Sequence, residues 1–407
     1  MRRLPPTRRE PHGRHVMAGE PLVFHCNFYN HWLQYVVLLS GGDEARQGIV
    51  DAAQGVAYNL LERAASELGL RTVEERLHLA VDMFAELGFG LLDLSATGPG
   101  GGEVKVPVSH YGMAAAGVAP WPVRTPESLW DAGYAAASLA VAQQVPVGTY
   151  RPYITACHSQ GARLGRIELR REEGLLAVFV PGRGPRTAVS PVPAAESGVD
   201  ELAIRESIEQ LPLVGNEEGL IPRFGVALTH HLAGFYDRIS FDALERADQA
   251  GTLEAAENLL VDAGYRCAFH TFSGVMESAE WEALVRPMCK TDEDWVHGMV
   301  AVLNTLGWGL WRVLELGRDR AVFRIYDDYE STGWLGSHGV ARRPVSYTAQ
   351  GAAAGLMNLV RVGRVQDGVV LDATHYERVF ESPASFRGRH ASSLACGDPW
   401  TEIVVTR

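Results

Sequence analysis

The spacing of apolar residues along the first half of the chain predicts helices that alternate with short strands. From Asp43 to Leu70 apolar side chains recur every three or four positions, which is typical of an amphipathic helix. Gly88 ends the next helical stretch, and apolar and polar residues then alternate as in half-buried strands. The predicted elements are helices over 43–70, 72–86 and 128–145 and strands over 20–28, 91–94, 104–108, 153–158 and 166–170.

A five-residue block at the end of the second predicted helix, Leu87–Leu91, recurs as Leu306–Leu310, 219 positions later (306 − 87). Both copies are apolar, with glycine at the second and fourth places. Other segments match in the same order along the chain: Phe24 and His31 with Phe224 and His231 at an offset of 200 (224 − 24), Gly133 with Gly351 at 218 (351 − 133), and the Cys157 and Ser393 segments at 236 (393 − 157). Because a duplication with insertions gives such rising offsets, we interpret the chain as two copies of one unit.

The predicted fold class is therefore α/β (α+β), with two similar domains that each pack an antiparallel sheet against helices. Residues 1–17 are basic and rich in proline, which predicts a disordered arm. A stretch rich in proline, serine and glycine, followed by a short helix, is typical of a linker. The predicted boundaries are an arm over 1–17, a first domain over 18–182, a linker over 183–216 and a second domain over 217–407.

Composition and charge exclude several classes of partner. The net charge of −12 disfavours nucleic acid, whose binding needs a basic surface. No apolar run reaches the ~18 residues of a membrane span, and the N-terminus lacks the pattern of a secretory signal. Five dispersed cysteines without a CxxC spacing predict reduced thiols. We therefore expect a cytoplasmic protein with neither a nucleic-acid nor a membrane partner.

Each predicted half has one order: a strand, helices, a glycine-marked helix end, strands, an Ala/Gly-rich helix and a terminal strand pair near a Cys/Gly segment. This order resembles the 4-vinyl-reductase-like domain. That domain is a small-molecule-binding α/β module, related in fold to haem nitric-oxide-binding domains and to transport-particle subunits. The resemblance covers about residues 20–182 and 217–407. It implies that apolar pockets in a bacterial protein bind a small hydrophobic or aromatic molecule.

The resemblance also concerns a structural zinc site, which some members hold through cysteines and a glutamate near the domain's end. In this chain the matching segments contain Cys157 and Cys396 at different places, and both lack the acidic residue. A further cysteine position of the family is Leu139 in one half and Met357 in the other. A zinc ion needs about four N, S or O ligands, so we expect no metal at this place.

Histidines supply the first group of candidate site residues. His31 and His231 match in the repeat, each at the predicted start of a helix. In a functional role they act as acid or base near neutral pH, or one of them ligates haem. In a structural role they satisfy the backbone of a helix turn. His25 lies beside them as a candidate ligand-binding residue, and His25 with Cys26 and His31 has a non-standard spacing for a metal.

Aromatic residues supply the second group. His110 and Tyr111 align roughly with Asp328 and Tyr329 at the predicted end of a strand. A tyrosine at such a place either presents its hydroxyl to a cavity as a general acid or covers the core. Trp308 and Tyr347 belong to an aromatic-rich second half, which forms either core or the wall of a cavity for a planar ligand. Asp327, Asp328 and Glu330 are interpreted as a solvated acidic loop.

Three functions remain open from the sequence. The first is a small-molecule-binding protein that serves as an accessory or carrier subunit beside a partner enzyme. The second is an enzyme acting on a small organic substrate in one domain's pocket, with His31, His231 or Tyr329 as its catalytic residues and haem as an alternative cofactor. The third is an assembly module that forms a homodimer. Fold resemblance alone does not decide among them.

Overall fold

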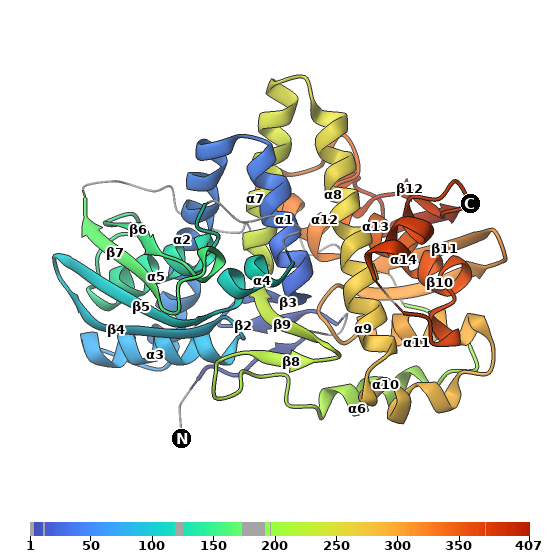
Figure 1. Ribbon diagram of the computed structural model, residues 1–407, viewed down its shortest axis with the longest axis horizontal. Helices are drawn as coiled ribbons and strands as arrows, with labels where there is room; N and C mark the ends of the chain where they lie inside the picture. Colours follow the sequence, from blue (N-terminus) through green and yellow to red (C-terminus); the bar gives the residue numbers. More distant parts are fainter. Residues whose placement is uncertain (1–3, 11–12, 119–124, 173–191, 196, 371) are drawn as a thin grey trace.

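Helices and three antiparallel sheets make up the computed structural model of the chain, so the predicted α+β class is confirmed (Figure 1). The structure describes residues 4–10, 13–118, 125–172, 192–195, 197–370 and 372–407. One four-stranded sheet lies in each half, and a five-stranded sheet between them takes strands from both.

The first half follows the predicted order of elements closely. The helix over 73–86 begins with a capping box. The Thr72 side chain accepts a hydrogen bond from the Glu75 backbone N–H, and the Glu75 carboxylate accepts one from the Thr72 backbone N–H. The elements are β3 (Glu20–Cys26), α1 (Asn27–Leu39), α2 (Gly42–Glu67), α3 (Val73–Glu86), β4 (Gly90–Gly98), β5 (Gly101–Ser109), α4 (His110–Val118), α5 (Leu129–Ala142), β6 (Tyr150–Ala156) and β7 (Gly165–Arg171). The sheet order is β4-β5-β7-β6.

The second half repeats this order with additional short helices. After α6 (Glu201–Glu209), it comprises β8 (Ile221–Arg223), β9 (Val226–Leu232), α7 (Ala233–Gln249), α8 (Leu253–Cys267), α9 (Ser273–Met276), α10 (Ala279–Leu284), α11 (Asp292–Leu303), β10 (Leu310–Leu316), β11 (Arg320–Tyr326), α12 (Tyr329–His338), α13 (Tyr347–Met357), α14 (Ala373–Phe380), β12 (Arg387–Ser392) and β13 (Thr401–Thr406). Its sheet order, β10-β11-β13-β12, matches that of the first half. A capping box of Thr291 and Asp294 starts α11, at an offset of 219 from that of α3 (291 − 72).

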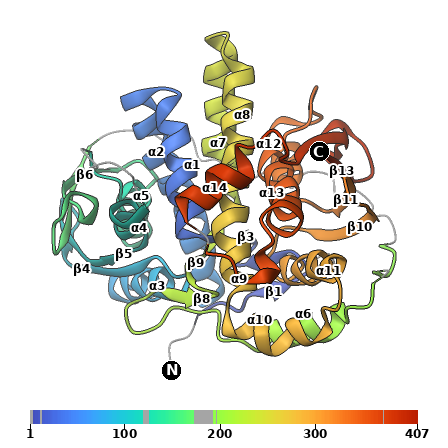
Figure 2. The ribbon, with the colours of Figure 1, turned by 45° about the vertical axis from the view of Figure 1, so that its right-hand side comes forward.

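The two halves meet through backbone pairing in the central sheet. There β3 runs antiparallel to β9, and Phe24 lies opposite His230. The helices that follow these strands begin at Asn27 and Ala233, an offset of 206 (233 − 27), and the same offset separates Phe24 from His230 (230 − 24). An antiparallel pair of corresponding residues, Phe24 and His230, defines an approximate twofold axis. The two halves lie on either side of the paired strands β3 and β9 (Figures 1 and 2).

The repeated glycine blocks occupy equivalent places in this arrangement. Gly88 and Gly307 have φ angles of 86° and 85°. A Cβ on either glycine would lie within 2.7 Å of a carbonyl oxygen of the opposite half. The Phe24 N–H donates to the Leu306 oxygen at 2.8 Å, and the His230 N–H donates to the Leu87 oxygen at 2.9 Å. Each block therefore forms a backbone hydrogen bond with the central-sheet strand of the opposite half. The origin of both halves from one duplicated unit stays an inference, and so do the predicted domain boundaries.

Two predictions about the connecting segments need comment. The arm predicted to be disordered instead adds β1 (Arg8–Arg9) and β2 (His15–Met17) to the central sheet, where β2 pairs with β3. The buried side chains of His15 and Met17 explain why this stretch is ordered. The short helix predicted in the linker is confirmed as α6. Residues 173–191, which cover the end of the predicted first domain and the start of the predicted linker, lie outside the described residues.

Candidate functional site

A buried cluster of histidine and tyrosine side chains lies where the two halves meet. The Tyr329 hydroxyl is 3.2 Å from His25 Nε2, and the Tyr111 hydroxyl is 3.0 Å from His231 Nε2. Both histidines are the next-to-last residues of their strands, at the same offset of 206 (231 − 25). The twofold arrangement therefore forms the same histidine–tyrosine hydrogen bond twice, each time between the two halves.

Aromatic rings enclose both histidines. The His25 ring stacks on Tyr29 with centroids 4.0 Å apart and lies 4.6 Å from Trp308. The His231 ring stacks on Phe235 at 4.8 Å and meets Phe89 edge-on at 4.8 Å. The aromatic residue of each glycine block therefore packs against a histidine of the opposite half.

Asn30 joins this cluster to the rest of the core. Its Nδ2 donates to the Thr229 Oγ1 at 2.9 Å and lies 3.0 Å from His110 Nε2, and its Oδ1 accepts a bond of 2.5 Å from the Tyr236 hydroxyl. Asn30 belongs to α1, Thr229 to β9 and Tyr236 to α7, so one amide links elements of both halves.

Burial keeps these histidines neutral. Loss of solvation lowers the pKa of His25 and His231 well below the usual value and lowers the pKa of His110 to about 3. A neutral ring is the form that can accept a hydrogen bond from a tyrosine or an amide. The cluster therefore resembles a polar core more than a site for proton exchange with solvent.

The sequence-based match of His31 with His231 is wrong. His31 is the fifth residue of α1, whereas His231 lies in β9 and corresponds to His25. The match depended on the equal spacing of Phe24 from His31 and of Phe224 from His231. In the first half this stretch crosses from β3 into α1. In the second half it ends inside β9 without reaching a helix. The residue that corresponds to His31 is Asp237, 206 positions later (237 − 31).

Beside this cluster, a small enclosed space lies between α7, α8, α12 and α13. We call it the tyrosine–carboxyl pocket, because four tyrosines and two carboxyl groups line it: Tyr29, Tyr236, Tyr329, Tyr347, Asp237 and Glu330. Its remaining lining residues are Ser240, Phe241, Leu244, Leu260 and Val345. It encloses about 10 Å³, which is room for about one water molecule.

The two carboxyl groups of this pocket differ in their partners. Glu330 accepts bonds from the backbone N–H groups of Thr348 and Ala349, at 3.0 and 3.1 Å, at the start of α13. Asp237 is 5 % exposed, and its Oδ1 has no hydrogen-bond partner among the described residues. A Cβ atom at position 333 would lie only 1.9 Å from the Asp237 Oδ2 and would collide with it. Glycine at position 333 therefore makes room for the Asp237 carboxylate.

Burial and mutual repulsion change the acidity of both groups. Burial, followed by the charge of Asp328, raises the pKa of Glu330 to about 8. Burial, followed by the charges of Glu330 and Asp328, raises the pKa of Asp237 well above its usual value. The expectation of a solvated acidic loop is thus wrong for Asp328 and Glu330, which are buried in the second half, 1 % and 9 % exposed.

The corresponding place in the first half has different polar side chains. His31 stands there with 5 % exposure and an unpartnered Nδ1, and burial lowers its pKa to about 4. Next to it the Gln34 Nε2 donates to the Glu127 carboxylate at 2.7 Å and to the Glu127 carbonyl oxygen at 3.0 Å. The two halves have therefore diverged at this place.

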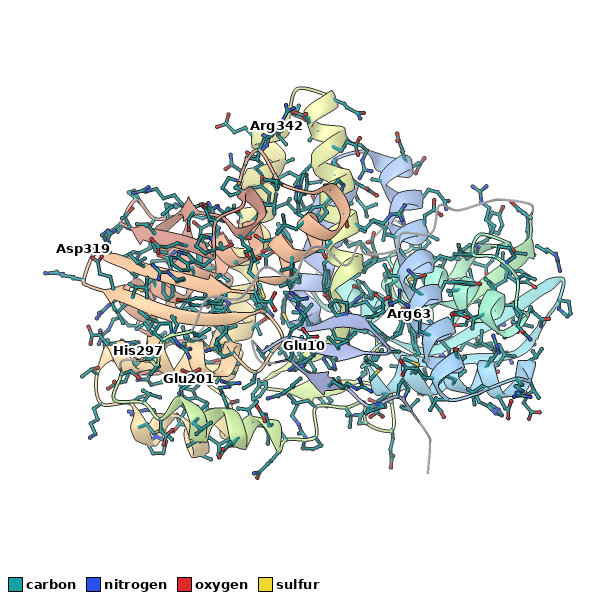
Figure 3. All side chains as sticks on the ribbon, turned by 180° about the vertical axis from the view of Figure 1, so that it is seen from behind. Glu10, Arg63, Glu201, His297, Asp319 and Arg342 are labelled. Atoms are coloured by element: carbon teal, nitrogen blue, oxygen red, sulfur yellow. The ribbon has the colours of Figure 1, made fainter. Side chains whose placement is uncertain are left out.

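A second small space lies away from the twofold axis, between α6, α11 and β10. Glu201, His297, Trp311 and Arg312 belong to its lining. Figure 3 labels Glu201 and His297. Glu201 already accepts bonds from Arg312 at 3.2 Å and from Asn304 at 2.9 Å. Its carboxylate already has an arginine and an amide as partners, so it offers less to a polar ligand than the tyrosine–carboxyl pocket.

The structure brings together most of the predicted candidates but gives them different settings. His25, Tyr111, Trp308, Tyr329 and His231 lie in or against the buried cluster, and His110 joins it through Asn30. Tyr329 and Tyr347 also line the pocket, where the Tyr347 hydroxyl donates to Glu257 at 2.8 Å. His31 lies in α1 apart from these bonds.

The most distinctive group of the pocket, Asp237, was not among the candidates. The only sequence signal for it is the alignment of the two strand–helix junctions, which places it opposite His31.

The described residues do not fit a metal, and the surroundings of His25 and His231 do not fit a haem. The described residues contain no group of three or more His, Cys, Asp or Glu placed to hold a metal ion. Cys157 Sγ instead lies 3.0 Å from the hydroxyls of Ser128 and Ser159. The Nε2 atoms of His25 and His231 already face tyrosine hydroxyls within a shell of aromatic rings, which leaves no open side for a porphyrin.

Comparisons with known proteins give little beyond this geometry. No family model matches the chain, and a search of the curated proteins finds no match. Among solved structures, the chain is similar to the phenol-responsive sensory domain of the transcription activator PoxR, solved with phenol. The identity is 15 %, the match covers 42 % of this chain and 73 % of that chain, and the TM-score is 0.31. At that score the likeness does not establish a shared fold. Within the described residues, no helix is long and apolar enough to cross a membrane.

Proposed function

We propose that the protein binds a small, mainly apolar organic molecule in the tyrosine–carboxyl pocket of its second half. The observation that supports this proposal is the Asp237 carboxyl, which is buried at the wall of the pocket without a hydrogen-bond partner for its Oδ1 among the described residues. Buried polar groups in folded proteins are nearly always paired, and an unpaired one calls for a water, an ion or a ligand. A bound molecule would supply the missing partner.

The lining suits an organic ligand with one polar group. Phe241, Leu244, Leu260 and Val345 provide apolar contacts, while the carboxyl groups lie together near α12. This combination of an apolar wall with a few polar groups is typical of small-molecule sites. The closed pocket holds only about 10 Å³, so a ligand larger than a water requires the lining to move apart. Ser240 is the half-buried residue of the lining and marks the side from which entry is easiest.

The proposal includes the accessory or carrier role beside an enzyme. The candidate residues His25 and His231 support binding over catalysis, because both are buried and hydrogen-bonded to tyrosines. A general base must reach the proton of a bound substrate, and neither histidine lines the pocket.

Native mass spectrometry of protein purified from its own host tests the proposal, together with a thermal-shift screen of small aromatic compounds. We expect a co-purified small molecule, or a rise in melting temperature with at least one compound, because a ligand that binds only the native state stabilises it. Leu244→Trp should fill the pocket and abolish the response. Leu202→Trp is the matched control, since Leu202 is exposed on α6. An unchanged response of the Leu244→Trp variant would place the ligand elsewhere.

A further inference from the structure

We infer that the polar group this pocket accepts is a protonated amine, so that the ligand is a small organic cation; the inference rests on the proposed function. The geometry that points to a cation is the juxtaposition of two buried carboxyl groups, Asp237 and Glu330, with four tyrosine side chains around one enclosed space. An ammonium group carries up to three N–H donors, which carboxylate oxygens accept.

The arrangement of the carboxyl groups indicates which donor is missing. Two backbone N–H groups hold Glu330 from the α13 side, whereas the Asp237 Oδ1 has no donor among the described residues. Arg14 is near enough to affect Asp237, but its guanidinium binds Asp327. No lysine or arginine side chain belongs to the lining of the pocket. An apolar ligand without a polar group would leave Asp237 unpaired, and an anion would be repelled by either carboxyl group once that group ionises.

Aromatic side chains strengthen the preference for a cation. Tyr29, Tyr236, Tyr329 and Tyr347 contribute rings to the lining, and Phe241 adds a fifth. The negative face of an aromatic ring attracts a cation, and the attraction is strongest where the site excludes water. Carboxylates and rings therefore select the same class of group.

The acidity of the site predicts how binding depends on pH. Burial and the neighbouring acids Asp328 and Glu330 raise the pKa of Asp237, and Arg14 opposes them. The pKa of Glu330 rises to about 8. Without a ligand Glu330 therefore holds a proton near neutral pH, and an ammonium group would displace it. Amine binding should therefore release protons and tighten between pH 6 and 8.

The first half predicts the stoichiometry. His31 replaces Asp237 there, and the bond between Gln34 and Glu127 occupies the adjoining space. A neutral histidine and a carboxylate already paired with an amide do not attract an ammonium group. We therefore expect one amine per chain.

Calorimetry with isosteric ligands tests the inference on the full chain. Benzylamine should bind at least tenfold more tightly than benzyl alcohol, and binding in two buffers of different ionisation enthalpy should reveal proton release. Benzoate and ammonium chloride serve as further probes. Asp237→Asn should abolish the tenfold preference without loss of stability, because the amide carries no charge. Glu245→Gln, at an exposed position of the same helix, should keep it.

The outcomes separate the two proposals. Equal or tighter binding of benzyl alcohol, or retention of the preference in Asp237→Asn, would overturn the amine inference and leave small-molecule binding intact. Equal stabilisation by ammonium chloride would overturn the organic part of the inference. If no compound of any charge binds to the wild-type protein, the proposed function itself fails.

Discussion

At the scale of single residues, the core of this protein depends on hydrogen bonds between buried polar side chains of the two halves. Tyr111 and Tyr329 each satisfy one histidine of the opposite half. The buried histidines have few alternatives, since water does not reach them and His231 Nδ1 is already unpartnered. Loss of either hydroxyl therefore leaves a buried acceptor unpaired, which costs more than a typical hydrogen bond contributes.

Tyr111→Phe and Tyr329→Phe should each lower the free energy of unfolding by about 1–3 kcal/mol. Each replacement removes one hydroxyl from a buried bond and leaves the ring in place. Urea unfolding followed by tryptophan fluorescence measures the change. Tyr35→Phe, on a half-buried residue of α1, is the comparison and should lose less. Equal losses of unfolding free energy in all three variants would mean that the tyrosine–histidine bonds contribute no more than the Tyr35 hydroxyl does.

Relative to the wild-type protein, Glu330→Gln should gain stability as the pH rises from 5 to 8, on top of a constant cost because the amide can accept from only one of the Thr348 and Ala349 N–H groups. The folded-state pKa of Glu330 is raised from 4.5 to about 8, so the folded state binds more protons than the unfolded state between these values. The contribution of Glu330 to stability is therefore present at low pH and falls as the pH rises, by up to about 1.4 kcal/mol per pH unit. Melting temperatures of both proteins from pH 5 to 8 provide the check. A melting temperature of the variant that falls relative to the wild type as the pH rises contradicts the raised pKa.

At the scale of elements, close helix contacts in both halves depend on glycine. Gly133 brings α5 so near to α2 that a Cβ would lie 2.4 Å from the Val50 oxygen. Gly351 brings α13 equally near to α8, where a Cβ would lie 2.1 Å from the Val261 oxygen. The atoms in the way belong to backbone, so a side chain at either place would have to push the helices apart.

Gly351→Ala and Gly133→Ala should each destabilise the protein by about 1–3 kcal/mol, the usual cost of overpacking. Gly55→Ala is the matched control, because Gly55 lies inside α2 and its Cβ would meet nothing nearer than the Arg238 guanidinium at 3.9 Å. Alanine suits a helix better than glycine, so this variant should gain up to about 1 kcal/mol. Thermal unfolding of the three variants gives the comparison, and a neutral Gly351→Ala would show that the helices separate readily.

Much of the element order could be predicted from the sequence, because helical spacing and turn glycines are local signals. The Leu-Gly-aromatic-Gly-Leu blocks were detectable since their glycines need positive φ angles, which few other residues adopt. The candidate site was only partly predictable. The carboxyl of Asp237 lies against α12, close in space to Glu330 but distant in sequence, and no local pattern records that neighbourhood. The false match of His31 with His231 arose because the residue spacing agreed while the elements did not.

At the scale of the whole molecule, the two halves share more than a surface. β3 pairs with β9 by backbone hydrogen bonds, α1 packs on α8, and α7 packs on α2. These contacts make each half part of the other's core.

The protein should therefore unfold in a single transition, although its length would permit two independent domains. Calorimetry should give a van't Hoff enthalpy equal to the calorimetric enthalpy. Hydrogen exchange should show that the β4-β5-β7-β6 and β10-β11-β13-β12 sheets lose protection together as denaturant is added. Two separated heat-absorption peaks would show that the central sheet does not couple the halves.

The pairing of Phe24 with His230 at the twofold axis has a consequence for any shorter form of this chain. A half-length polypeptide would expose the edge of β3 or of β9, with its row of unpaired N–H and carbonyl groups. The natural partner for that edge is the same strand of a second identical molecule, because the ladder already joins corresponding strands in antiparallel orientation. A protein made of one half would thus be a symmetric dimer, and joining two such genes would convert concentration-dependent assembly into ordinary folding of one chain.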